Sequence, residues 1–281
     1  MLTNVFLYNY SRWTKIDLDE IIYNLRKIFS NLFLTKVKKN DTRFSRSNFS
    51  QIEIDFQYFQ SKCVIKNIKD QLDINKILPF RKGIKDEFTI NPNNINKQLY
   101  FQNKLAKEFG FEENIVMYDG IILQKLYQEI LGKIGLEFNL SELYIIIIDD
   151  LIGSFDEIDW KYHARSIICG NPTLISTSGL IYGLAKPKDY YLKLIYYYRV
   201  PQILKTLKKE YRGRCIENND ERINSIVEGL AIQSIYYFIK GDSFCDDPTC
   251  RLFNSHWQEE ILRLNFNKFF CKKHLDIIRK L

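Results

Sequence analysis

Three cysteines and one histidine near the carboxyl end of the sequence are spaced as two chelating pairs. The first pair is Cys245-x4-Cys250, the second is Cys271-x2-His274, and twenty residues separate them. Zinc takes thiolate and imidazole ligands at about 2.0–2.3 Å, and such close pairs converge where a turn lets both side chains face inward. Pro248 supplies a turn within the first pair. The spacing predicts two loops and an intervening helix folded around one zinc ion.

The identity of the fourth ligand and the role of the zinc also follow from the spacing. His256 competes with His274, but His274 is favoured because its spacing from Cys271 is itself chelating, whereas His256 falls at an expected helix start. The alternatives to a zinc site are a chance spacing and a disulfide between Cys245 and Cys250, and a reducing compartment disfavours the disulfide. Because four protein ligands leave no open position for water or substrate, the zinc is predicted to be structural.

Length and composition are those of a globular protein. The 281 residues, 46% of them hydrophobic, fit one large domain or two modest ones. The longest apolar run, Leu143–Ile148, is stopped by Asp149 and Asp150, and a membrane helix needs about 18 residues. The amino terminus lacks the early positive charge and apolar core of a signal peptide. We therefore expect a cytoplasmic protein without a membrane partner.

The net charge of +7 makes nucleic acid a possible partner. Basic residues are in local excess at Arg26–Arg46, at Lys205–Arg214 and from Arg263 onward. They are scattered, however, and no RNP, helix-turn-helix or zinc-finger pattern accompanies them. Solvated lysine-rich faces are the favoured interpretation.

The amino-terminal part is predicted to contain strands and one amphipathic helix. Strands are expected at Val5–Tyr8 and Ile52–Tyr58, and apolar residues at helical spacing predict a helix over Ile21–Leu32. The segment Phe80–Ile95, which follows Pro79 and contains Gly83 and Pro92, is the best candidate break. We therefore divide the chain into an amino-terminal α/β region, residues 1–95, and a second domain, residues 96–281.

The second domain is predicted to be an α/β unit that ends in helices. Helices are expected at 96–109, 121–131, 189–209 with a kink at Pro201, and 221–240, and strands at 114–118, 143–148, 166–169 and 173–176. Gly241 should end the helix that precedes the first cysteine. Ser255 and Gln258 form a potential capping box, so a last helix should begin at His256 and bury Trp257.

The cysteine region resembles the end of archaemetzincins, zinc peptidases of the metzincin class. In that family, H-E-x-x-H-x-x-G-x-x-H runs directly into C-x4-C-x-M and a later C-x2-C, whose cysteines hold a second, structural zinc. In this sequence, Leu252 replaces the methionine and His274 replaces the last cysteine. More loosely, 148–151 and 174–180 resemble strands that frame the family's cleft. The resemblance covers residues 115–281 and implies a metzincin-like mixed sheet, an active-site-type helix and a zinc-pinned carboxyl-terminal segment.

The catalytic part of the family's pattern is missing from this sequence. With Cys245 fixing the register, Ser234, Phe238 and Phe244 stand where the family has its zinc-binding histidines. Ile235 replaces the catalytic glutamate, and Gly241 alone survives. The chain has three histidines in all, and one is assigned to the structural site. A three-histidine catalytic zinc therefore cannot be assembled.

An unusual ligand set remains as an alternative source of hydrolysis. A zinc hydrolase needs an open metal position and a carboxylate that moves the proton, and His163, Glu228 and His256 are the candidates if they converge. The simpler interpretation makes His163 a capping or partly buried residue and Glu228 a solvated helix carboxylate. Ser176-Thr-Ser-Gly179 does not match a nucleophile elbow, and no glycine-rich phosphate loop is present.

These patterns favour a non-catalytic relative of archaemetzincins that carries one structural zinc and binds a peptide or a protein. The first alternative is an active metal-dependent peptidase or hydrolase with non-standard ligands. The second alternative is a basic nucleic-acid-binding protein with a structural zinc.

Overall fold

The computed structural model describes residues 2–36, 64–65, 117–133, 138–158, 161–197, 206–207 and 209–279, and in these ranges the strands form two mixed sheets. The first sheet has the order β2 (Phe33–Lys36), β1 (Asn4–Asn9), β5 (Glu142–Ile148), β9 (Thr173–Ser176), β8 (Ile167–Ile168). Its strands are parallel except for β8, which runs antiparallel to β9. The second sheet has the order β3 (Val64–Ile65), β4 (Met117–Asp119), β6 (Leu151–Asp156), β7 (Lys161–Arg165).

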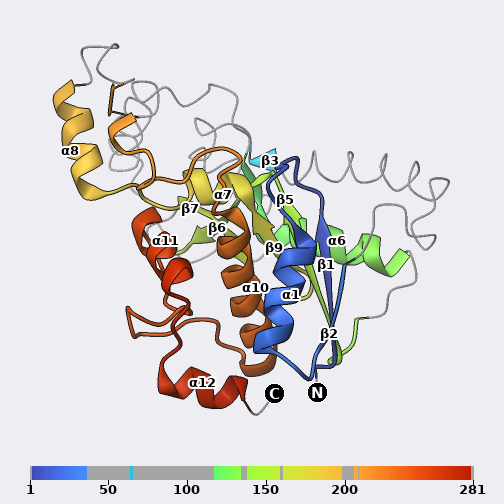
Figure 1. Cartoon of the computed structure of the whole chain (residues 1–281). Coiled ribbons are helices and arrows are strands. Elements are labelled where there is room, and N and C mark those ends of the chain that lie inside the picture. The colour runs from blue at the N-terminus through green and yellow to red at the C-terminus, as the bar shows by residue number, and fades with distance from the viewer. Residues whose placement is uncertain are drawn as a thin grey trace.

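The central strand β5 carries apolar side chains on both of its faces, because helices cover both sides of the sheet. Leu143, Ile145 and Ile147 belong to a core shared with α1 (Leu18–Ile28) and α10 (Ile223–Lys240). The alternate residues Tyr144, Ile146 and Ile148 pack in a second core with α6 (Gly120–Lys133). Figure 1 shows α1 and α10 side by side next to this sheet. A continuous apolar run is typical of a parallel strand buried between two helical layers.

Helix α10 is the most deeply buried helix near the carboxyl end of the described chain. Its residues from Ile226 to Tyr236 are all buried, and Gly241 ends it in the left-handed conformation at φ 77°. The remaining helices are α7 (Thr177–Tyr182), α8 (Lys188–Tyr197), α11 (Gln258–Asn267) and α12 (Lys272–Ile278). Helix α11 lies beside the amino-terminal half of α10, where Ser225 donates to the Asn265 carbonyl, and α12 lies near its carboxyl-terminal end (Figure 1).

Most predicted elements in the described ranges are confirmed. The strands predicted at Val5–Tyr8, Leu143–Ile148 and Thr173–Ser176 and the helices that correspond to α1, α6 and α10 are present. The helix predicted from residue 189 begins at Lys188, and its kink at Pro201 lies outside the described residues, as do the strand at 52–58 and the helix at 96–109. The α/β class is confirmed. The boundary at 95/96 also lies outside the described residues and stays a prediction, although β1 and β5 share one sheet.

The predicted capping box at Ser255 and Gln258 is wrong. Helix α11 begins at Gln258 after Trp257, and the Glu260 carboxylate accepts hydrogen bonds from the backbone N–H groups of His256 and Trp257. Gln258 is buried instead and serves as a bridge. Its side chain accepts from the Ile216 N–H and donates to the Ile181 carbonyl. Glutamate takes the third helical position because it reaches back to the free N–H groups of the helix start.

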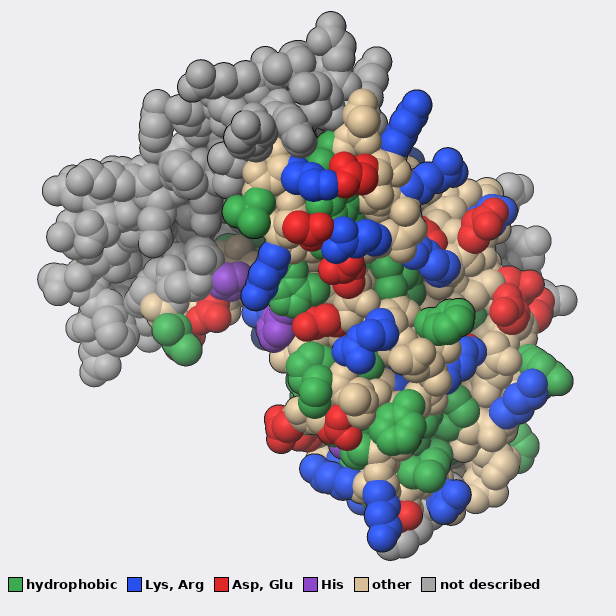
Figure 2. All heavy atoms as spheres, turned by 60° about the vertical axis from the view of Figure 1, so that its left-hand side comes forward, with side chains coloured by type: hydrophobic (Ala, Val, Ile, Leu, Met, Phe, Trp, Pro, Cys, Tyr) green, Lys and Arg blue, Asp and Glu red, His purple; other side chains and the backbone are tan. Residues whose placement is uncertain are grey.

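The described surface carries charges of mixed sign. Figure 2 shows lysine and arginine side chains interspersed with aspartate and glutamate on one face. Within the predicted basic stretch 205–214, Arg214 forms ion pairs with Asp189 at 2.8 Å and with Glu259 at 2.5 Å. Lys193 pairs with Glu210. Nucleic-acid binding stays a prediction. Among the described helices, none is long and apolar enough to cross a membrane.

Candidate metal centre and adjoining pocket

The ligand atoms of Cys245, Cys250, Cys271 and His274 all lie within 4.8 Å of one another. The Cys245 and Cys271 sulfurs are 3.8 Å apart, and the Cys250 sulfur is 3.7 Å from Nδ1 of His274. The shortest separation, 2.9 Å, joins the Cys271 sulfur to the same Nδ1. The structure therefore brings the four predicted ligands into one cluster, and Nδ1 is the imidazole nitrogen that faces the sulfurs.

The dimensions of the cluster suit a tetrahedral zinc ion. Two sulfurs that each lie about 2.3 Å from zinc at tetrahedral angles are about 3.8 Å apart, which matches the separation between Cys245 and Cys271. Thiolate and imidazole are the ligands that zinc prefers in structural sites. The residues present thus fit a zinc ion with four protein ligands.

Backbone hydrogen bonds hold the two chelating loops in place. The Cys245 N–H donates to the Leu252 carbonyl at 2.8 Å, which closes the first loop, and the Arg251 N–H donates to the Phe269 carbonyl at 2.6 Å, which joins it to the second. The Asp247 N–H points at the Cys245 sulfur, 3.4 Å away, and the Cys271 N–H points at the Cys250 sulfur, 3.5 Å away. Such N–H groups stabilise negative charge on sulfur.

Burial shapes the protonation of the cluster. Cys250 and His274 are almost fully buried. Burial raises the pKa of the Cys250 thiol to about 12, raises the pKa of Cys245 and lowers the pKa of His274. The neutral imidazole is ready to bind a metal, whereas the buried thiols need a cation nearby before they lose their protons.

The residues of the alternative catalytic set do not come together. In the described part of the chain, the cluster above is the sole group of three or more His, Cys, Asp or Glu side chains placed to hold a metal. His163 lies on β7 with Nε2 3.9 Å from a carboxylate oxygen of Asp156. His256 lies at the start of α11, exposed. His256 is therefore not the fourth member of the cluster.

The prediction that Glu228 is a solvated helix carboxylate is wrong. Its side chain is 2% exposed and is ion-paired with Arg251 at 2.6 Å and with Lys268 at 3.0 Å. The partners come from segments that lie after α10 in the sequence, so helical periodicity gives no sign of them. Arg251 directly follows Cys250, a predicted metal ligand. This position is the one feature of the sequence that indicates a buried charged side chain near α10.

The three positions that replace the family's zinc-binding histidines have ordinary structural roles. The Ser234 side chain is fully buried and donates to the Leu230 carbonyl at 2.8 Å. Phe238 packs against the main core, and Phe244 is 38% exposed and lines a pocket. Ser176 caps α7 by accepting from the Gly179 N–H, which accounts for the Ser176-Thr-Ser-Gly179 stretch.

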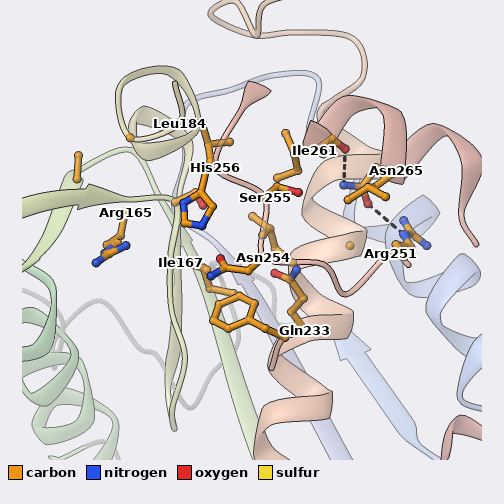
Figure 3. Close-up of a pocket in the computed structure, with 17 residues that line it drawn as sticks. Arg165, Ile167, Leu184, Gln233, Arg251, Asn254, Ser255, His256, Ile261 and Asn265 are labelled. Carbon is orange, nitrogen blue, oxygen red and sulfur yellow. Dashed lines mark hydrogen bonds between the residues drawn. The ribbon is translucent and has the colours of Figure 1, made fainter. Parts of the chain in front are cut away.

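A pocket with a volume of about 110 Å³ lies between residues 164–167 and the middle of α10, at Gly229, Leu230 and Gln233. Residues 254–256, three residues of α11 and Phe244 also line the pocket. Figure 3 shows Gln233 extending from α10 toward Asn254, while the Arg165 side chain points away from them. Arg165 donates to the Ser154 hydroxyl at 2.8 Å, so its backbone rather than its guanidinium faces the hollow.

The fold, the cluster and the pocket together define a class of protein: an α/β protein with a Cys/His cluster placed to hold a metal ion and a pocket beside a buried helix. The chain belongs to the "Probable metallopeptidase family (DUF6775)", whose family model matches residues 1–281. The predicted metallopeptidase relationship is thereby confirmed. No curated protein matches the sequence.

The comparison with solved structures gives a match to the crystal structure of archaemetzincin from Methanopyrus kandleri. The two chains are 8% identical, the match covers 99% of this chain and 94% of that chain, and the TM-score is 0.42.

Proposed function

We propose that this chain is a non-catalytic, archaemetzincin-like member of its metallopeptidase family that binds a peptide segment and uses one zinc ion as a structural cross-link. The observation that carries the proposal is the single cluster of Cys245, Cys250, Cys271 and His274 in the described part of the chain. The zinc joins the segment after α10 to the start of α12. When bound, it supplies folding free energy and no reaction, because four protein ligands occupy its tetrahedron.

Two observations support the absence of catalysis. Once His274 is assigned to the cluster, only His163 and His256 remain in the whole chain, and they lie on β7 and before α11. Peptide hydrolysis by a zinc enzyme also needs a general base beside the metal-bound water. Glu228, the candidate base on α10, is instead bonded to Arg251 and Lys268.

The position of the pocket supports a peptide as the ligand. Residues 164–167 line it, and they join β7 to β8, the terminal strands of the two sheets in the described ranges. A terminal strand offers main-chain N–H and C=O groups that pair with an extended peptide, and neighbouring pockets then take its side chains. Phe244 and the apolar wall formed by Leu184, Ile261 and Leu264 suit such side chains.

The experiment incubates the purified, zinc-loaded chain with a tryptic digest of serum albumin. We expect the immobilised chain to retain a subset of the peptides, and mass spectrometry to find no new fragments after prolonged incubation. Phe244→Asp should abolish retention because it places a charge in the pocket. Phe266→Asp is the matched control, because Phe266 is 87% exposed and does not line the pocket.

Either of two results contradicts this proposal. New fragments that disappear when a chelator is added support the metal-dependent hydrolase instead. Equal retention by the Phe244→Asp and Phe266→Asp variants excludes the pocket as the binding site. Salt-sensitive retention of nucleic acid, with no retained peptide, favours the nucleic-acid-binding alternative, because added ions weaken phosphate contacts.

A further inference from the structure

The Gln233 side chain is mostly buried, but its amide has no hydrogen-bond partner among the described residues. It lies on α10, is 7% exposed and lines the pocket. In the described part of the chain, no protein group bonds to its side chain, and no fully buried side-chain nitrogen or oxygen lacks a partner. The Gln233 amide must therefore face the open space of the pocket. Figure 3 shows it directed toward that space.

The buried glutamine of α11 shows what a structural amide looks like in this fold. Gln258 is fully buried, and its amide accepts from one backbone N–H and donates to the carbonyls of Leu180 and Ile181. Buried polar groups are nearly always paired in this way, because an unpaired one loses its bonds to water. Gln233 departs from this pattern, and it does so in a pocket, where a ligand can replace the missing partner.

The surroundings of Gln233 favour a neutral ligand group. Arg251, which also lines the pocket, is committed to Glu228 at 2.6 Å, and the guanidinium of Arg165 is turned away. The Asn265 side chain is bonded to Arg251 and to the Ile261 carbonyl. The remaining polar residues of the lining are Ser166, Asn254, Ser255 and His256. A carboxamide offers donors and an acceptor side by side. It therefore forms two parallel hydrogen bonds with a primary amide, or with the N–H and C=O groups of one residue in an extended peptide.

We propose that Gln233 is the recognition residue of the pocket and that it binds an amide group of a peptide ligand, from the main chain or from an Asn or Gln side chain. This inference rests on the proposed peptide-binding function. It adds that the pocket selects a neutral amide over a carboxylate.

The test uses N-acetylglycinamide as the probe and N-acetylglycine as its anionic counterpart, each titrated into the full zinc-loaded chain and followed by NMR. We expect the amide to bind at least about ten-fold more tightly than the acid. Gln233→Leu should weaken amide binding about ten-fold, since two hydrogen bonds are lost. Gln128→Leu, the same change at an exposed position of α6, should leave binding unchanged.

Thermal unfolding separates recognition from a structural role. Because its amide has no partner among the described residues, Gln233→Leu should keep or raise the melting temperature while it weakens amide binding about ten-fold. A lower melting temperature with unchanged amide binding assigns Gln233 to structure and overturns the inference, as does a wild-type chain that does not bind the amide. Peptide cleavage in the albumin experiment would contradict the proposed non-catalytic function. It would not affect the Gln233 inference, which the amide titration tests separately.

Discussion

Glu228 and Arg251 form an ion pair of 2.6 Å in which the two side chains are 2% and 0% exposed. Arg251 sits directly after Cys250, so the pair ties the first chelating loop to the middle of α10. Asn24 of α1 also donates to Glu228, at 3.1 Å, and Asn265 of α11 accepts from the Arg251 Nε at 3.0 Å. Burial lowers the pKa of Arg251, and the carboxylate of Glu228 opposes this effect.

Replacing one partner of this pair should strongly destabilise the protein. Arg251→Met leaves the buried Glu228 carboxylate with Lys268 and Asn24 as partners. Removal of one member of a buried ion pair lowers the free energy of unfolding by about 3–5 kcal/mol. Urea denaturation of zinc-loaded protein measures the change. Arg263→Met is the control, because Arg263 is exposed and donates to the Pro248 carbonyl. It should cost less than about 1 kcal/mol. Equal losses of unfolding free energy in the two variants would show that the buried ion pair contributes no more to stability than an exposed arginine.

Gly229 allows Asn265 to approach α10, and a methyl group there should be harmful. A Cβ at Gly229 would overlap the side-chain oxygen of Asn265. The Asn265 side chain is held in place because its oxygen accepts from Arg251 and its nitrogen donates to the Ile261 carbonyl. Gly229→Ala should therefore cost about 1–3 kcal/mol. Gly132→Ala on α6 meets no atom within 4 Å and should stabilise by up to about 1 kcal/mol. Melting temperatures that rise in both variants would contradict the described packing.

The stability contributed by Asp149 should depend on pH. Burial acts to raise the pKa of Asp149, but hydrogen bonds from Ser11, Arg12 and Thr177 outweigh it, and the pKa is lowered overall. Because the folded pKa lies below the unfolded value of about 3.9, the contribution is complete above that pH. It is lost as the pH falls through the folded pKa.

The variant Asp149→Asn tests this pH dependence by chemical denaturation. At pH 7 it should be less stable than the wild type by about 1–3 kcal/mol, and the difference should shrink below about pH 4. Comparing the two proteins at the same pH cancels the protonation of the metal ligands. Asp276→Asn, at an exposed position of α12, is expected to have no effect at either pH. A difference for Asp149→Asn that stays constant from pH 7 to pH 3 would exclude ionised Asp149 as its source.

The two histidines near the carboxyl end should respond differently to substitution. His274→Ala removes a ligand that is 1% exposed and should lower zinc affinity at least 100-fold, with a large fall in melting temperature, because binding and folding are coupled at such sites. His256→Ala should leave both unchanged, because His256 lies in the pocket wall. Competition with a colorimetric zinc chelator measures the affinities. Loss of zinc from the His256→Ala protein would reverse the assignment of the fourth ligand.

Local patterns in the sequence were sufficient to predict the central elements and the cluster. The run Leu143–Ile148 predicts a buried strand because both faces of β5 are covered, and the four cluster residues follow from chelate spacing and one helix. Gly241 marks the end of α10 because its positive φ suits glycine.

Long-range contacts were not predictable in the same way. Glu228 and Arg251 are 23 residues apart, and no periodicity links them, so Glu228 was wrongly expected to face solvent. Gln233 has no sequence signal at all, since only the absence of a partner in three dimensions distinguishes it from Gln258. The start of α11 was predicted at His256, two residues before its true start at Gln258. The error arose because Ser255 and Gln258 match the sequence pattern of a capping box, whereas Glu260 is the residue whose side chain bonds back to the start of the helix.

Elemental analysis of the purified full-length chain tests the central claim, which is one structural zinc and no catalytic zinc. We predict one zinc ion per wild-type chain, one in the Cys215→Ala control, whose cysteine is buried outside the cluster, and almost none in Cys245→Ala. Two zinc ions per wild-type chain, or a full zinc ion in Cys245→Ala, would contradict the account.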